Sequence, residues 1–275
     1  MHRRLFVAGG ALLMGGWALQ SPAQRAKTAT VNALVPAGQI SLTSAINKAG
    51  RQRMLSQRMV KAYAQLGLGV LPERSMKIME GSRELFENQL AELLEFSPSP
   101  GIKNLYQEMK TLWHACREDL MTAPSPEVGP TLFKSSEDIL KIAHRATLEM
   151  EKMSGTAAGR MVNVSGRQRM LSQRAAKLYM FREWRVPQAI ESDLKSVREE
   201  FGQALAQLKS APESTAEIKS LLSLAESQWL FFDRALDPKK TIGQEDEISR
   251  RNVATTSERL LEIFEAVTGM YEKSA

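Results

Sequence analysis

The sequence contains one nine-residue block twice: Gly50-Arg51-Gln52-Arg53-Met54-Leu55-Ser56-Gln57-Arg58 returns letter for letter as Gly166-Arg167-Gln168-Arg169-Met170-Leu171-Ser172-Gln173-Arg174. The same offset of 116 residues, from Gly50 to Gly166, relates further matches on both sides of the block. Asn47, Lys61, Tyr63, Ile102, Lys103, Trp113 and Leu120 match Asn163, Lys177, Tyr179, Ile218, Lys219, Trp229 and Leu236. A repeat of this length indicates that each half of the chain is one structural unit. We call the repeated block the arginine box.

Prolines and glycines divide each half into four helix-sized segments. In the first half we expect helices over about 41–67, 72–96 and 102–121, and a fourth from about 132. The second half repeats the pattern, with breaks at Pro187, 211–213 and 237–238. Short loops between helices of this length make neighbouring helices antiparallel. The predicted fold is therefore all-α, with two tandem four-helix up-down bundles.

The junction between the halves allows two interpretations. No proline lies between Ser135 and Trp184, so one very long helix can be drawn through the junction. The segment 154–159 nevertheless holds Gly155, Gly159 and a potential N-cap at Thr156, which favour a helical hairpin. A hairpin would bring Arg53 and Arg169 to the same height, about 10 Å apart or less, whereas a continuous helix would separate them by about 40 Å. With the hairpin, the two halves form a pseudo-dimer within one chain.

The N-terminus is typical of an export signal. Arg3 and Arg4 precede an apolar stretch from Leu5 to Leu19, which ends in Ser21-Pro22-Ala23. The paired arginines indicate either a twin-arginine or a general secretory signal, with cleavage near Ala23. We expect a signal peptide over 1–23, a linker over 24–40, one helical repeat over 41–155 and a second over 156–275. The predicted location is periplasmic or secreted.

Composition and motifs exclude several classes of function. The net charge of +6 is small and dispersed, which argues against nucleic acid as a partner and suits a small anion. Cys116 is the only cysteine, so no internal disulfide is expected. His114 and Cys116 cannot share a helix face, and no phosphate loop or catalytic triad is recognisable. We therefore predict no metal, no cofactor and no enzymatic activity.

The arginine box is amphipathic in an unusual way. At about 100° per residue, Gln52, Ser56 and Tyr63 face the helix's own bundle. A neighbouring stripe combines Gly50 and Arg53 with aliphatic residues, which indicates that another helix packs closely there. A guanidinium in such a seam needs a partner, and a planar oxyanion matches its donors. The alternative is that Arg53 and Arg169 are solvated or pair with glutamates.

The pattern Asn47-x-x-Gly50-x-x-Arg53-Met54-x-Ser56-x-Arg58 resembles the P-box of bacterial nitrate/nitrite sensor kinases. Its fuller form is similar to the type IV pili methyl-accepting chemotaxis transducer N-terminal (PilJ-type) domain, over both halves. The resemblance implies sensor domains that dimerise through their first helix and grip nitrate or nitrite at the seam. It implies ligand-binding roles for Arg53, Arg169, Gly50, Gly166, Asn47, Asn163, Arg58 and Arg174.

The resemblance implies an exported sensor-type binding protein that recognises a small oxyanion and relays to a membrane-bound sensor or receptor. Family sensors are membrane-held and continue into a signalling module, and from this sequence we expect neither an anchor nor such a module. The alternative is a structural or protein-interaction module of the cell envelope that uses the same box as a docking face. A homodimer is a further expectation for the assembly.

Overall fold

The computed structural model describes residues 40–186, 190–236 and 244–274. The described residues form eight helices and no strand, which confirms the predicted all-α fold. The first half contributes α2 (Leu42–Gly67), α3 (Pro72–Phe96), α4 (Pro100–Leu120) and α5 (Gly129–Ser154). The second half contributes α6 (Ala157–Glu183), α7 (Ile190–Ser210), α8 (Ala216–Ala235) and α9 (Gln244–Lys273). The predicted signal peptide and the linker up to Gln39 lie outside the described residues.

Local chemistry sets the helix boundaries. The hydroxyls of Ser41, Ser99, Thr156 and Thr215 accept a hydrogen bond from the amide three residues on, at 3.0–3.3 Å. Helices α3 and α4 begin with a proline, which has no amide hydrogen to leave unpaired in the first turn. The expected boundaries in the first half hold to within about three residues, the usual uncertainty of a helix end.

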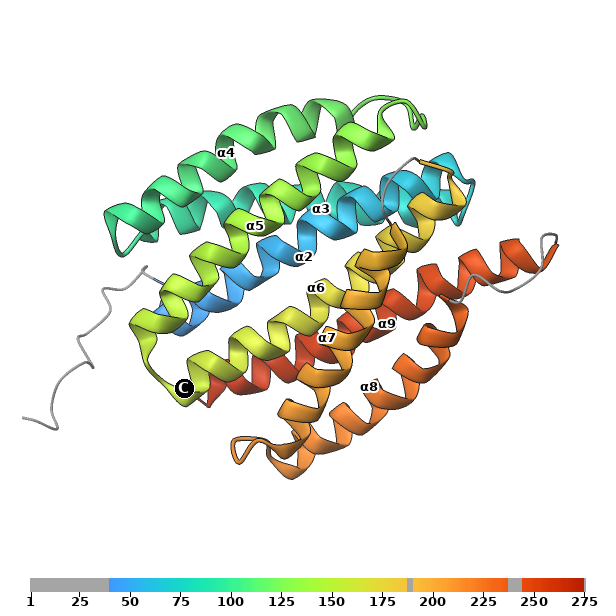
Figure 1. Ribbon diagram of the computed structural model, residues 1–275. Helices are drawn as coiled ribbons and strands as arrows, with labels where there is room; N and C mark the ends of the chain where they lie inside the picture. The colour runs from blue at the N-terminus through green and yellow to red at the C-terminus, as the bar shows by residue number, and fades with distance from the viewer. Residues whose placement is uncertain (1–39, 187–189, 237–243, 275) are drawn as a thin grey trace, which may run out of the picture. The chain divides into compact units, whose positions relative to one another are not determined.

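The junction is a hairpin. Helix α5 ends at Ser154, and Gly155 follows with a φ of 59°, the left-handed conformation that glycine adopts without a Cβ penalty. Thr156 then caps α6. The continuous helix is thereby excluded, and the chain reverses between α5 and α6 (Figure 1).

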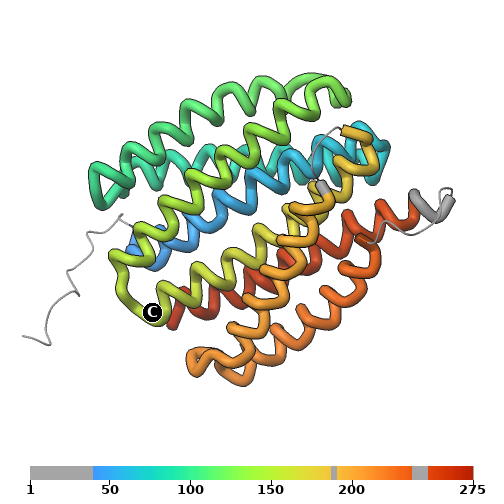
Figure 2. The backbone as a smooth tube through the Cα atoms, in the orientation of Figure 1, coloured from blue at the N-terminus to red at the C-terminus, as the bar shows by residue number. Residues whose placement is uncertain are grey.

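Each half is a four-helix bundle, and the two bundles meet along α2 and α6. Helix α2 packs against α3 and α5, and α6 packs against α7 and α9. Helices α2 and α6 also pack against each other more extensively than any other helix pair, side by side in the tube view (Figure 2). Residues Ile40–Ala275 therefore form one compact unit that contains both repeats. We call the contact between α2 and α6 the seam.

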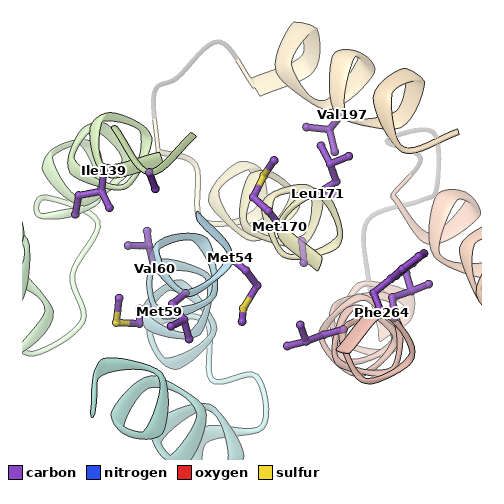
Figure 3. Close-up of a cluster of buried hydrophobic side chains, with 14 of the residues drawn as sticks. Met54, Met59, Val60, Ile139, Met170, Leu171, Val197 and Phe264 are labelled. Atoms are coloured by element: carbon purple, nitrogen blue, oxygen red, sulfur yellow. The ribbon is translucent and has the colours of Figure 1, made fainter. Parts of the chain in front are cut away.

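The cores of the two bundles are built alike. Phe86 lies 4.5 Å from Trp113 in the first half, and Phe201 stacks on Trp229 at 3.6 Å in the second, measured between ring centroids. Figure 3 shows buried side chains of both halves together, namely Met54, Met59, Val60 and Ile139 of the first and Met170, Leu171, Val197 and Phe264 of the second. Within the described residues, no helix combines the length and apolar character that crossing a membrane requires.

Candidate functional site

The seam brings the two boxes to the same height. Arg53 on α2 and Arg169 on α6 are both fully buried. A Cβ built on Gly50 would lie 3.0 Å from Nη2 of Arg53 and 3.7 Å from Nη2 of Arg169. At Gly166 the distances are 2.9 Å to Nη2 of Arg169 and 3.7 Å to Nη2 of Arg53. Both guanidinium groups thus lie beside the same two glycines, as the hairpin interpretation predicts.

Each arginine is held by an asparagine from the opposite half. Nη2 of Arg53 donates to Oδ1 of Asn163 at 2.8 Å, and Nη2 of Arg169 donates to Oδ1 of Asn47 at 2.7 Å. The amide nitrogen of each asparagine donates in turn to a glutamate, Glu151 for Asn163 and Glu272 for Asn47. These glutamates fix the side-chain amides with their oxygens toward the arginines. The seam is therefore closely two-fold symmetric at this level.

The symmetry ends at the partner of Nη1 of each arginine. Nη1 of Arg53 lies 3.2 Å from Nδ1 of His144 on α5. Nη1 of Arg169 instead donates to Oε2 of Glu265 on α9 at 2.7 Å. Glu265 also accepts two hydrogen bonds from Arg51, at 3.1 and 2.7 Å. One seam arginine therefore contacts a carboxylate and the other contacts an imidazole.

The local electrostatics follow from burial and from these partners. Burial, with Arg167 and Arg169 nearby, lowers the pKa of Arg53 to about 9. Burial and the same kind of cationic neighbours, Arg53 and Arg167, lower the pKa of His144 to about 4, so its ring is neutral at pH 7. Burial opposes ionisation of Glu265, but Arg169 and Arg51 outweigh it and lower that pKa to about 2.

The guanidinium groups keep hydrogen-bonding capacity. A guanidinium has five N–H donors. Nε of Arg169 is buried and donates to no atom of the described protein, and Nε of Arg53 has only the carbonyl of Gly50 at 3.5 Å. Buried donors of this kind are rare and point to a ligand or a solvent molecule. Paired N–H donors of this kind match the oxygens of a small planar anion.

Arg58 and Arg174, predicted as supporting site residues, do not reach the seam arginines. Five residues along a helix rotate a side chain by about 140° from the position of Arg53 or Arg169. Arg58 pairs with Glu258 of the other half, and Arg174 pairs with Glu137 at 2.8 Å. We therefore leave both out of the candidate site, which consists of Asn47, Gly50, Arg53, His144, Asn163, Gly166, Arg169 and Glu265.

The same glutamates hold two fully buried lysines. Nζ of Lys61 lies 2.5 Å from Oε1 of Glu258, and Nζ of Lys177 lies 2.6 Å from Oε1 of Glu137. Each lysine crosses the seam to the opposite half, so the two clusters tie the bundles together reciprocally. We call these the ion clusters. Both carboxylates have pKa values lowered to about 2, because their cations outweigh the effect of burial.

Sequence reasoning missed His144 and Glu265 because the last helix of each half follows another offset. Ser136 corresponds to Ser257, 121 residues later rather than 116. Their carbonyl oxygens accept equivalent hydrogen bonds from Gln57 and Gln173. The repeated Ser-Glu at 136–137 and 257–258, with Glu-Lys at 151–152 and 272–273, could have revealed this register.

In the described part of the chain, no group of three or more histidine, cysteine or acidic side chains could hold a metal ion. The surface pockets at Met76, Met79 and Met121 and at Gly202 and Leu230 are lined by residues outside the box.

A comparison with protein families gives one match. Residues 37–130 and 153–256 match PilJ, described as Type IV pili methyl-accepting chemotaxis transducer N-term. Comparisons with curated proteins and with solved structures give no match. Each matched stretch contains one arginine box and the first three helices of its bundle. Domains of this family are sensory or signalling modules of chemotaxis transducers. The chain therefore belongs to the PilJ family and carries two stretches of it in tandem.

Proposed function

We propose that this protein is an exported sensor-type binding protein that takes up a small oxyanion of the nitrate or nitrite class between Arg53 and Arg169. The observation that carries the proposal is an excess of buried positive charge at the seam. Two fully buried guanidinium groups lie beside the same glycines, and among the described residues only one of them contacts a carboxylate. An unpaired buried charge is costly, and an anion between the two groups would offset their repulsion.

The family supports a sensory role, and the geometry supports a planar anion. Arg53 and Arg169 come from the two halves, so one anion would bridge both bundles. The guanidinium groups are fully buried, so an anion can enter only when α2 and α6 separate locally. Binding would then stabilise the closed seam, and a membrane-bound receptor could read that change.

The alternative, a docking module, has less support. Gln52, Arg53, Ser56 and Gln57 of the first box are buried, as are their counterparts in the second. A buried box offers little surface to a partner protein. Family sensors are expected to dimerise through their first helix. In this chain the corresponding face of α2 is covered by α6.

Thermal unfolding in a nitrate series tests the proposal. Ligand that binds only the native state adds about 2.7 kcal/mol at one hundred times its dissociation constant. We expect sodium nitrate to raise the melting temperature above that in sodium chloride of equal ionic strength. Arg53→Gln should abolish the nitrate-specific rise and cost little stability without nitrate, since it relieves repulsion with Arg169.

The matched control is Arg234→Gln, which removes the same charge from an exposed position on α8. It should keep the full nitrate response. Equal responses of wild type, Arg53→Gln and Arg234→Gln would remove the proposal. Unfolding of Arg53→Gln would make that arginine a structural partner instead.

A further inference from the structure

We call the surroundings of Nη1 of Arg53, with His144, the Arg53 corner, and the surroundings of Nη1 of Arg169, with Glu265, the Arg169 corner. The two corners differ at one pair of equivalent positions. In the register that aligns Ser136 with Ser257, Glu151 corresponds to Glu272, and both accept from a site asparagine. In that register His144 corresponds to Glu265, and both contact Nη1 of a seam arginine. Nη2 of each seam arginine makes equivalent contacts to the asparagine of the opposite half, Asn163 for Arg53 and Asn47 for Arg169. The exchange of imidazole for carboxylate also changes the neighbouring pair, because Arg51 contacts Glu265 whereas its counterpart Arg167 contacts Glu200.

At the Arg169 corner, a carboxylate of the protein already holds the arginine. Oε2 of Glu265 lies 2.7 Å from both Nη1 of Arg169 and Nη2 of Arg51. A carboxylate and a nitrate ion are both planar and both present two oxygens to a guanidinium. Because Glu265 is tethered to α9, it competes with a free anion at a high effective concentration.

At the Arg53 corner, no carboxylate among the described residues contacts the arginine. An arginine can only donate, so Nδ1 of His144 accepts from Nη1, and the ring proton is on Nε2. The nearest acidic group that acts on Arg53, Glu151, is hydrogen-bonded to Asn163 instead. The charge of Arg53 is therefore met only by neutral acceptors.

We propose that the seam binds a single oxyanion off-centre, at Arg53, which Asn163 positions, and at His144, and that Glu265 serves as an internal counterion that closes the Arg169 corner. This inference rests on the proposed function and names the half of the seam that does the binding. A neutral imidazole can carry its proton on either nitrogen. When the anion replaces Nδ1 as the acceptor of Nη1 of Arg53, the ring proton can lie on Nδ1, and His144 would then donate to an oxygen of the bound anion as a further ligand-binding residue.

Four variants test the assignment by isothermal titration with sodium nitrate at pH 7.5. His144→Glu gives the Arg53 corner its own carboxylate and should weaken binding by about tenfold or more, about 1.4 kcal/mol. His144→Gln keeps a neutral acceptor and should weaken binding less. Glu265→Gln removes the counterion and should strengthen binding.

The fourth variant exchanges the two corners. In His144→Glu/Glu265→His, the net charge is unchanged, and binding should move to Arg169. Adding Arg53→Gln to this variant should then be tolerated, whereas adding Arg169→Gln should abolish binding, the reverse of the wild-type order. Circular dichroism melts establish that each variant is folded.

The outcomes separate the inference from the proposed function. If wild type binds no nitrate, the proposed function fails. If wild type binds nitrate but His144→Glu binds equally well, or Arg169→Gln loses more affinity than Arg53→Gln, the off-centre assignment is overturned while the proposed function stands.

Discussion

The ion clusters and the arginine corners lie on the same seam but differ in how well the two halves agree. In the ion clusters, Lys61 pairs with Glu258 and Lys177 pairs with the equivalent Glu137, and both lysines are fully buried. At the corners, Arg53 and Arg169 are equivalent residues, but their Nη1 atoms contact different side chains, His144 and Glu265. In each cluster a lysine and an arginine contact the same carboxylate across the seam, whereas the corners leave the charge of Arg53 without a contacting carboxylate among the described residues.

The difference between the ion clusters and the corners distinguishes structural residues of the arginine box from those proposed to bind a ligand. A buried cation that contacts a carboxylate satisfies itself and needs no ligand. A buried cation with only neutral acceptors remains a site for an anion. The arginine box therefore has two roles on one helix. Its C-terminal part, with Lys61 or Lys177 three residues further on, joins the bundles, and its N-terminal part presents the proposed anion site.

The largest expected effect comes from breaking an ion cluster. Glu258→Gln leaves Lys61 and Arg58 without their carboxylate and should lower the free energy of unfolding by about 3 kcal/mol. Glu137→Gln should cost a similar amount in the opposite cluster. Urea unfolding measures both.

The control is Glu92→Gln, which removes the partner of Lys48 in an exposed pair and should cost about 0.5 kcal/mol or less. If the cluster variants cost no more than this control, the clusters do not hold the bundles together. A large difference between Glu258→Gln and Glu137→Gln would break the equivalence of the two clusters.

The pH dependence sharpens the same comparison. The pKa of Glu258 falls from an ordinary 4.5 to about 2 in the folded protein. Its contribution is therefore fully present above pH 4.5 and is lost as pH falls from there toward 2. The stability difference between wild type and Glu258→Gln should shrink by about 2 kcal/mol between pH 7 and pH 3. A difference that is constant over this range would show that Glu258 is not held ionised by its cations.

The smallest effect on stability is expected at Gly50, which lies beside both seam arginines. Gly50→Ala gains about 1 kcal/mol of helix propensity, but its Cβ would lie 3.0 Å from Nη2 of Arg53 and so displace a flexible guanidinium. We expect nearly unchanged stability and about tenfold weaker nitrate binding.

Gly81→Ala on α3, where a Cβ meets nothing within 4 Å, is the matched control and should keep wild-type nitrate binding. Equal nitrate binding by both alanine variants would mean that the close approach at Gly50 serves packing alone.

The sequence predicts most of the fold and part of the candidate site. Proline spacing and capping residues predict the helices, because these residues act on their immediate neighbours. The exact repeat, together with the hairpin signal at 154–159, predicts that Arg53 and Arg169 lie side by side. The repeat does not predict the partners of the two Nη1 atoms, because His144 and Glu265 lie more than ninety residues from their arginines in the sequence. They also follow an offset of 121 residues instead of the 116 that relates the two boxes. Arg58 and Arg174, predicted as supporting site residues, pair with Glu258 and Glu137 instead of lying beside the seam arginines, because the box spans more than one face of its helix.

Isothermal titration of the wild-type protein with sodium nitrate, against sodium chloride of equal ionic strength, tests the central claim most directly. If the two boxes share one site at the seam, nitrate should bind saturably with one ion per chain. Arg53→Gln should remove that binding without unfolding the protein. The absence of saturable nitrate binding, or a stoichiometry of two ions per chain, would contradict the account.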